Sequence, residues 1–211
     1  MYTILVVDDS RFIVDVFVTM LERGGYRTVA AYGGNECLEI LKTMTPDLIL
    51  MDIMMEPVDG WETLKRIKED PKTKEIPVLM LTGKQLTPAE AQEYGIYIED
   101  YVLKPITSRE LYDAIEHVLN RRRSIKSDID LARESGFDEE IISEYARLSK
   151  SIDVNHRLVK ILKTTTDFNN SKVRDSDEIS RAIESMDMNI RFQETRLQQI
   201  KAEMSGAKSG I

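Results

Sequence analysis

The first half of the sequence alternates short apolar runs, rich in β-branched residues, with longer amphipathic stretches. This alternation is typical of β–α units on a parallel sheet, because strands that helices cover on both faces are apolar along their whole length. The pattern therefore predicts an α/β fold with a five-stranded, doubly wound parallel sheet. We expect strands at Thr3–Val7, Thr28–Ala31, Leu48–Met51, Val78–Leu81 and Tyr101–Leu103.

Helical periodicity fills the stretches that follow these strands. Capping boxes at Thr87–Glu90 and Thr107–Glu110 mark the starts of the fourth and fifth helices. Because helices cover both faces of the sheet, the carboxyl ends of the strands form one open edge. Folds of this kind bind their ligands at that edge. The expected helices span about 11–22, 35–43, 60–69, 88–93 and 108–122.

Polar residues stand at the ends of four of the five expected strands. Asp8 and Asp9 end the first strand, Asp52 the third, Thr82 the fourth and Lys104 the fifth. Three carboxylates in one place repel one another unless a cation neutralises them, and Mg²⁺ prefers carboxylate, carbonyl and phosphate oxygens. A hydroxyl and a lysine stabilise charge on a transferred phosphoryl group, while one carboxylate serves as the nucleophile. The residues predict a Mg²⁺-dependent phosphoryl-transfer site.

These residues lie in five short motifs, which occur in order along residues 1–123. Through them the chain resembles the receiver domains of two-component response regulators, including the chemotaxis regulators. Any one motif alone is weakly specific, whereas five in the right order are a specific signal. The motifs are Val6-Val7-Asp8-Asp9-Ser10, Leu50-Met51-Asp52, Asp59-Gly60, Leu81-Thr82-Gly83 and Tyr101-Val102-Leu103-Lys104-Pro105.

The resemblance implies a flavodoxin-like sheet with strand order 2-1-3-4-5, and it assigns roles at the acidic site. Asp52 is expected to be the phosphoacceptor. Asp9 is expected to bind Mg²⁺ directly and Asp8 through water, with Asp52 and the backbone carbonyl of Met54 as further ligands. One departure from the family pattern is Glu56, which stands where many receivers have proline.

The resemblance also implies how a phosphoryl group would be sensed. Thr82 and Lys104 are expected to contact the phosphoryl oxygens, and the Lys104–Pro105 peptide bond is expected to be cis. Tyr101, three residues before Lys104, is expected to be the aromatic switch residue. Its movement with Thr82 would alter the face made by the fourth helix, the fifth strand and the fifth helix.

The expected function is that of a phosphorelay response regulator. A sensor histidine kinase would supply the phosphoryl group, and the receiver would control a helical output module, without being an enzyme that acts on an external substrate. Two alternatives stay open: a scaffold that is not phosphorylated and acts through a coiled coil, and a Mg²⁺-dependent phosphohydrolase. The absence of a substrate-binding insertion disfavours the phosphohydrolase, and the complete acidic set disfavours the scaffold.

After Arg121–Arg123 the strand signal stops, and residues 124–211 are expected to form an all-α module. Helices at about 138–163 and 177–204 each carry apolar residues in heptad spacing, interrupted by Asn155 and Gln193. The two helices could fold back as a hairpin or pair with another chain. A downstream protein and a homodimer through this tail are the expected partners. The seams are Ile141, Tyr145, Leu148, Ile152, Val159 and Leu162, and Ile179, Ile183, Met186, Ile190, Leu197, Ile200 and Met204.

Charge and composition narrow the remaining classes of function. The net charge of −8 disfavours nucleic acid as a partner. The single cysteine, Cys37, cannot form an internal disulfide, and the apolar run Thr3–Val7 is too short for a signal peptide or a membrane span. We therefore expect a cytoplasmic protein without membrane insertion. His156, midway along a helix, is either a solvent-facing residue or a phosphotransfer histidine.

Overall fold

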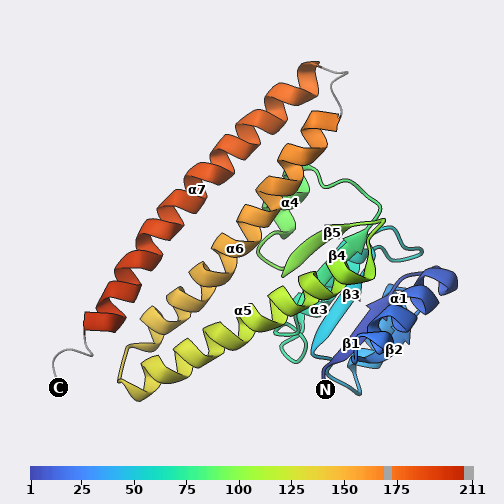
Figure 1. Cartoon of the computed structure of the whole chain (residues 1–211), viewed down its shortest axis with the longest axis horizontal. Helices are drawn as coiled ribbons and strands as arrows, with labels where there is room; N and C mark the ends of the chain where they lie inside the picture. Colours follow the sequence, from blue (N-terminus) through green and yellow to red (C-terminus); the bar gives the residue numbers. More distant parts are fainter. Residues whose placement is uncertain (169–172, 207–211) are drawn as a thin grey trace. The chain divides into compact units, whose positions relative to one another are not determined.

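The computed structural model describes residues 1–168 and 173–206 (Figure 1). Contacts divide the chain into two units. The first consists of residues 1–85 and 97–116, and the second of residues 86–96 together with the described chain from residue 117 onward.

A five-stranded parallel sheet forms the centre of the first unit (Figure 1). The strand order β2-β1-β3-β4-β5 confirms the predicted fold. In the register of the sheet, Val7 of β1 pairs with Ala31 of β2 and with Met51 of β3. Because these strands end together, the residues that follow them lie at one edge. The strands are β1 (Thr3–Val7), β2 (Arg27–Ala31), β3 (Leu48–Met51), β4 (Val78–Thr82) and β5 (Asp100–Leu103).

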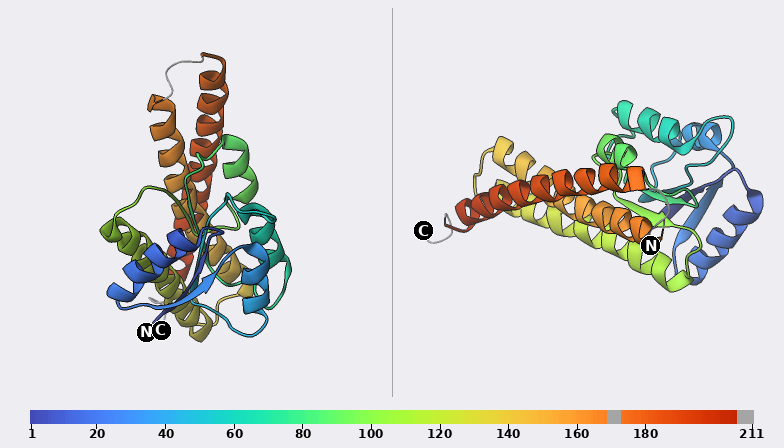
Figure 2. Two further views of the ribbon diagram at one scale, coloured as in Figure 1. Left: turned by 90° about the vertical axis from the view of Figure 1, so that its right-hand side faces the viewer. Right: turned by 90° about the horizontal axis from the view of Figure 1, so that it is seen from above.

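Helices cover both faces of this sheet, as the apolar strands require. α2 (Gly34–Leu41) and α3 (Gly60–Glu69) lie on one face, and α1 (Arg11–Arg23) lies on the other (Figure 2). The first turns of α5 (Ser108–Glu134) pack beside α1, where the Tyr112 hydroxyl donates a hydrogen bond to the Met20 carbonyl oxygen. Every residue of β3 and β4 is buried between these layers, and this apolar core fixes the strand ends in place.

The fifth helix is longer than its expected span of 108–122. α5 continues to Glu134 because the sequence through that residue contains no glycine or proline to interrupt it. Gly136, with φ of +76°, then provides the left-handed conformation that reverses the chain. The expected boundary between residues 123 and 124 therefore lies within one continuous helix.

Two long helices in the second unit, α6 (Glu139–Phe168) and α7 (Val173–Gly206), run side by side as an antiparallel hairpin (Figures 1 and 2). Of the two arrangements left open, the chain adopts the hairpin. Tyr145 and Leu148 of α6 pack with Ile200 of α7. The expected turn at Asn169–Ser171 lies outside the described residues.

The polar residues that interrupt the two seams contact one another through a serine. The Asn155 amide donates to the Ser151 hydroxyl oxygen at 3.2 Å, and that hydroxyl donates to the Gln193 side-chain oxygen at 3.1 Å. Such a bonded chain satisfies partly buried polar groups and favours one register of the hairpin over its neighbours.

Two polar clusters join α6 to the second half of α5. Asp153 accepts from Arg121 and lies 2.9 Å from His117 Nε2. Burial acts to raise the pKa of Asp153, but the hydrogen bond from His117 and the charge of Arg121 outweigh it and hold the pKa below its usual value. The Tyr145 hydroxyl donates to Asp128 at 2.6 Å, and burial together with this carboxylate raises the pKa of Tyr145 to about 12.

The short helix α4 (Pro88–Tyr94) belongs to the second unit. Its start has the predicted capping box, in which Thr87 and Glu90 bond to each other's backbone N–H. A Cβ on Gly95 would come within 3.0 Å of Leu158 Cδ1, and Lys150 Nζ donates to the Ile96 carbonyl oxygen at 3.3 Å. The residues that directly follow α4 are thus packed closely on α6, and α4 itself contacts α7.

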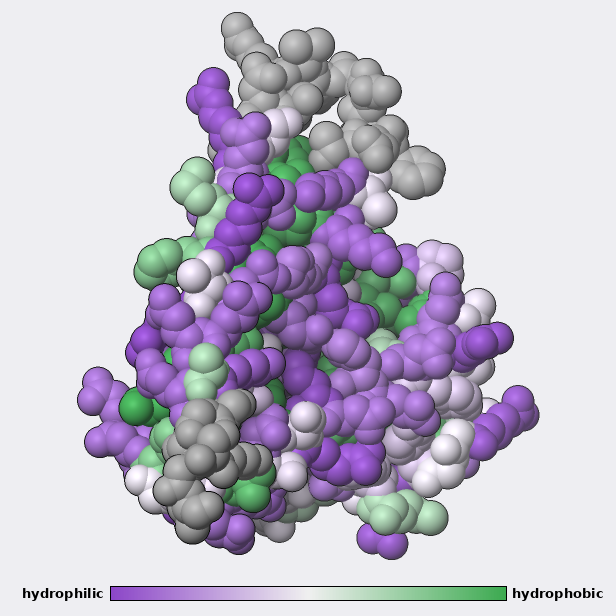
Figure 3. Space-filling model, turned by 60° about the vertical axis from the view of Figure 1, so that its left-hand side comes forward, coloured by the Kyte–Doolittle hydropathy of each residue, from purple (hydrophilic) through white to green (hydrophobic). Residues whose placement is uncertain are grey.

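The surface of the protein is largely polar. Hydrophilic residues predominate on the face that Figure 3 presents, with apolar ones between them. Across the described ranges 1–168 and 173–206, none of the helices has both the length and the apolar character needed to span a bilayer.

Candidate functional site

Asp8 and Asp52 come together because the strands that precede them are neighbours in the sheet. The Asp52 N–H donates to the Val7 carbonyl oxygen at 2.9 Å, so the residue after β3 continues the ladder with β1. Asp8 in turn donates its N–H to the Ala31 carbonyl oxygen of β2 at 3.2 Å. Both carboxylates are buried, with residue exposures of 4% for Asp8 and 7% for Asp52.

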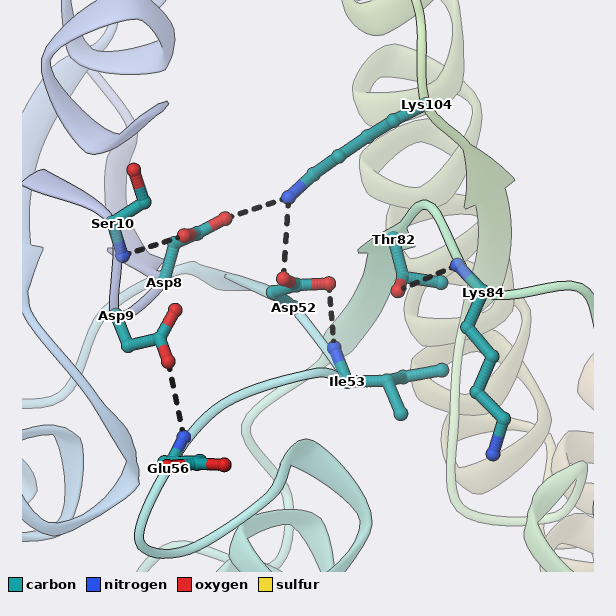
Figure 4. A network of polar contacts seen from close by, with 9 residues as sticks. All are labelled: Asp8, Asp9, Ser10, Asp52, Ile53, Glu56, Thr82, Lys84 and Lys104. Atoms are coloured by element: carbon teal, nitrogen blue, oxygen red, sulfur yellow. Dashed lines mark hydrogen bonds and ion pairs between the residues drawn. The ribbon is translucent and has the colours of Figure 1, made fainter. Parts of the chain in front are cut away.

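The ammonium group of Lys104 lies between these two carboxylates (Figure 4). Its Nζ is 2.6 Å from Asp8 Oδ2 and 3.4 Å from Asp52 Oδ2. The other oxygens are also satisfied, since Ser10 N donates to Asp8 Oδ1 and Ile53 N donates to Asp52 Oδ1. A buried carboxylate pair is costly without a cation, and the lysine supplies that charge.

Asp9 is exposed and bonds to the loop that follows β3. Its Oδ2 accepts from the Glu56 N–H at 3.1 Å, which brings the loop alongside Asp9 (Figure 4). The Glu56–Pro57 peptide bond is cis. The loop also returns over Asp52: a Cβ on Gly60 would lie 2.2 Å from the Asp52 carbonyl oxygen. Only glycine fits there, which explains the Asp59-Gly60 motif.

Thr82 ends β4 and is fully buried on the side of Asp52 opposite to Asp8 (Figure 4). Its hydroxyl oxygen accepts from the Lys84 N–H at 3.2 Å. Tyr101 is also buried, and its hydroxyl donates to the Lys84 carbonyl oxygen at 2.6 Å. The loop after Thr82 therefore connects the strand end to the Tyr101 ring. The Lys104–Pro105 bond is cis, as predicted.

The oxygen atoms at this site are of the kind that binds Mg²⁺. Asp8, Asp9, Asp52 and the Met54 carbonyl provide the hard oxygen ligands that this ion prefers. Within residues 1–168 and 173–206, however, no three acidic, histidine or cysteine side chains are gathered tightly enough to hold a metal as they stand. Lys104 and the Glu56 N–H engage Asp8 and Asp9 instead. The chemistry fits a divalent cation, provided that these carboxylates turn away from their present partners.

Three relationships at the site were missed from the sequence. They are the pairing of Lys104 with Asp8, the backbone donor at Glu56, and the packing of Trp61 against Tyr101. The Lys104–Asp8 pair and the Glu56 N–H donor depend on the path of loops, whose sequences have no periodic pattern. The third had a weak signal, because Trp61 follows the glycine of the Asp59-Gly60 motif directly.

His156 stands apart from the acidic site, in the second unit. Its Nε2 lies 3.0 Å from Glu194 Oε1 of α7, and its side chain is 54% exposed. This contact is one of several polar bridges across the hairpin, such as the pair between Arg196 and Glu144. The geometry is that of a surface bridge between two helices.

Two family models match the chain. Residues 4–116 match the response regulator receiver domain, and residues 121–208 match Metanogen output domain 2. The phosphate regulon transcriptional regulatory protein PhoB of Pseudomonas aeruginosa is 35% identical over 119 residues, which are 56% of this chain and 52% of that protein. A probable cyclic di-GMP phosphodiesterase of Vibrio cholerae is 34% identical over 151 residues, or 72% of this chain and 34% of that protein. The chain thus spans at most about half the length of these relatives.

Solved structures of receivers are also similar. The N-terminal domain of a response regulator receiver protein from Methanoculleus marisnigri is 72% identical, with a TM-score of 0.49, over 56% of this chain and 97% of that one. The chemotaxis protein CheY4 of Vibrio cholerae is 29% identical, with a TM-score of 0.53, over 56% of this chain and 99% of that one. Because the receiver domain model matches residues 4–116, which are more than half of the chain, the chain belongs to the response regulators.

Proposed function

We propose that the chain is a phosphorelay response regulator that accepts a phosphoryl group on Asp52 and thereby controls its helical module. The observation that carries the proposal is the placement of the Lys104 ammonium between Asp8 and Asp52 at the carboxyl ends of β1 and β3. This arrangement sets a buried carboxylate next to a cation that accommodates added negative charge.

In the proposed step, a carboxylate oxygen of Asp52 attacks the phosphorus of a phosphohistidine on a sensor histidine kinase. The new P–O bond forms as the P–N bond breaks, and the imidazole keeps the electron pair and takes up a proton. Thr82 and Lys104 then contact the phosphoryl oxygens. Asp8, Asp9, Asp52 and the Met54 carbonyl would hold Mg²⁺, which supplies charge neutralisation for the transferred group.

In this proposal residues 1–123 form the receiver and residues 124–211 form the output module. The output module binds a downstream protein and a second copy of the chain. The Tyr101 switch would act through the Lys84 carbonyl, since this loop leads from Thr82 directly into α4. α4 contacts α7, and the residues directly after α4 pack on α6, so a change in the loop reaches the hairpin by a short path of covalent and packed contacts. We place this signalling in the cytoplasm.

One relative suggests an alternative, in which the output module is an enzyme. The probable cyclic di-GMP phosphodiesterase shares 34% identity, but the match takes in only 34% of its length. We propose instead that the described helices α6 and α7 have a role in binding. Polar residues on their facing sides bond to each other across the hairpin, as His156 does with Glu194 and Ser151 with Gln193, and are therefore not grouped as a catalytic site.

The test is intact-protein mass spectrometry after incubation with acetyl phosphate and Mg²⁺. The full chain should gain one labile phosphoryl group. Asp52→Asn should gain none, whereas Asp113→Asn, which changes an exposed carboxylate on α5, should label like the unmodified chain. Labelling of the Asp52→Asn variant, or no labelling of the full chain while a known receiver labels in parallel, refutes the proposal and favours the scaffold.

A further inference from the structure

α7 carries a second pattern on the face opposite to the hairpin seam. The seam face buries Met186, Ile190 and Ile200 against α6. On the other face, exposed residues recur in alternating steps of four and three, which is the spacing of a heptad stripe. We call this set the outer stripe, and it consists of Arg181, Ser185, Met188, Phe192, Thr195 and Gln199.

The centre of the outer stripe is apolar and open to solvent. Met188 is 71% exposed and Phe192 is 75% exposed, and the two side chains are four residues apart, so they are neighbours on the helix surface. Although charged residues make up 31% of the chain, none occurs at the five stripe positions from Ser185 to Gln199. A neutral stripe with an apolar centre is typical of a surface that a partner helix covers.

The outer stripe is symmetric about a point midway between Met188 and Phe192. Moving outward from this point, each apolar residue is followed by a hydroxyl residue, Ser185 on one side and Thr195 on the other. Longer polar side chains follow on both sides. A sequence that is equivalent in both directions is self-complementary under a two-fold axis, because each residue of one copy then meets its counterpart on the other.

We propose that the outer stripe pairs with the outer stripe of a second copy of this chain, with the two α7 helices antiparallel. Each Phe192 would then lie on the partner's Met188, which is a favourable sulfur–aromatic contact, and each Ser185 would face the partner's Thr195. This assignment deepens the proposed output role, on which it rests, by naming the surface through which two output modules meet.

Charge supports a second copy as the occupant. In the antiparallel arrangement Arg181 faces the partner's Gln199, so the two arginines stand at opposite ends of the interface. No position of the outer stripe therefore sets like charges against each other. A parallel pairing would instead place each Arg181 beside the same residue of the partner, which is unfavourable.

The first experiment measures the mass of the full chain by sedimentation velocity over a hundredfold range of concentration. We expect a monomer–dimer equilibrium that Phe192→Glu weakens by on the order of thirtyfold or more, because two central contacts are lost per dimer. Phe12→Glu is the matched control, since Phe12 is 73% exposed in the first unit, and it should leave the equilibrium unchanged. A chain that stays monomeric throughout, or a Phe192→Glu variant that dimerises like the unmodified chain, overturns the proposal.

The second experiment tests the direction of pairing by disulfide formation. A mixture of Ser185→Cys and Thr195→Cys chains should cross-link, because these positions face each other. Ser185→Cys alone should not, since its two copies would be offset by ten residues, or about 15 Å along the helix. Cys37 is buried and does not compete. Faster cross-linking of Ser185→Cys alone than of the mixture contradicts the antiparallel arrangement.

The same samples separate this inference from the proposed phosphorylation. A chain that labels on Asp52 but remains monomeric refutes the interface and leaves the receiver chemistry standing. A chain that dimerises through Phe192 but never labels refutes the phosphorelay instead. Asp52→Asn should dimerise like the unmodified chain when no phosphoryl donor is present.

Discussion

The ring of Tyr101 lies against the indole of Trp61, with ring centroids 6.4 Å apart and planes inclined by 26°. Both side chains are buried, and the Tyr101 hydroxyl is bonded to the Lys84 carbonyl oxygen in the loop after β4. Trp61 therefore contacts the residue that we propose as the switch, one residue after the Gly60 that approaches the Asp52 backbone.

Trp61 should report phosphorylation through its fluorescence. It is the only tryptophan in the chain, so its emission is unambiguous. Mg²⁺ and acetyl phosphate together should change the emission intensity, because the proposed switch moves the Tyr101 ring when Asp52 is phosphorylated. Asp52→Asn should abolish the change. Emission that stays constant while mass spectrometry detects full labelling would contradict the switch role of Tyr101.

Replacing Lys104 by methionine should make stability depend on Mg²⁺. The variant keeps the unbranched shape of the side chain up to the ε position but leaves two buried carboxylates without their cation, which should destabilise the receiver by about 3 kcal/mol in EDTA. Mg²⁺ should then raise the melting temperature of the variant more than that of the unmodified chain. Labelling from acetyl phosphate should slow by on the order of a hundredfold.

Lys42→Met is the control for this prediction. Lys42 pairs with Glu39 at the surface, where both side chains are more than half exposed, and such pairs contribute little to stability. Equal melting temperatures of Lys104→Met in EDTA and in Mg²⁺ would argue against a divalent cation at this site.

Gly60→Ala should destabilise the receiver by about 3 kcal/mol, because the added methyl group meets backbone atoms that cannot move aside. Its Cβ would lie 2.2 Å from the Asp52 carbonyl oxygen and 2.7 Å from Ile53 Cα. Gly83→Ala should cost little, since its nearest neighbour is Met54 Cε at 3.6 Å. Urea unfolding of both variants measures the difference, and equal midpoints would show that the loop is free to shift.

Tyr145 should make the helical module lose stability at alkaline pH. Its pKa is raised to about 12 from 10.0, so the folded state keeps a proton that the unfolded state has lost between these values. The contribution is therefore complete below pH 10 and disappears as pH rises toward 12, and solvent screening of the partly exposed hydroxyl limits it to about 1 kcal/mol. Helix unfolding in urea, followed by circular dichroism at a series of pH values, measures it.

Tyr145→Phe is the matched variant for the pH series. It lacks the hydroxyl that donates to Asp128, so it should be less stable by about 1 kcal/mol at neutral pH. Its stability should fall less between pH 10 and 12, and the two curves should approach each other. Parallel curves over that interval would show that Tyr145 ionises at an ordinary pKa.

Local signals in the sequence located most secondary structure and every residue proposed for the site. Apolar runs such as Leu48–Met51 predicted strands because their burial on both faces leaves no polar position. Capping residues such as Thr87 predicted a helix start because the cap bonds only to neighbours in the chain. Asp8, Asp52 and Lys104 were placed at one edge because parallel strands share the direction of their ends.

Tertiary structure alone decided which groups meet. Lys104 pairs more closely with Asp8 than with Asp52, although 96 residues separate Lys104 from Asp8. The heptad seams were compatible with a hairpin or with another chain, and contacts such as Ser151 to Gln193 belong to the hairpin. Periodicity and capping depend on residues a few positions apart, whereas partner choice depends on the sum of many weak contacts over whole surfaces, which no local pattern encodes.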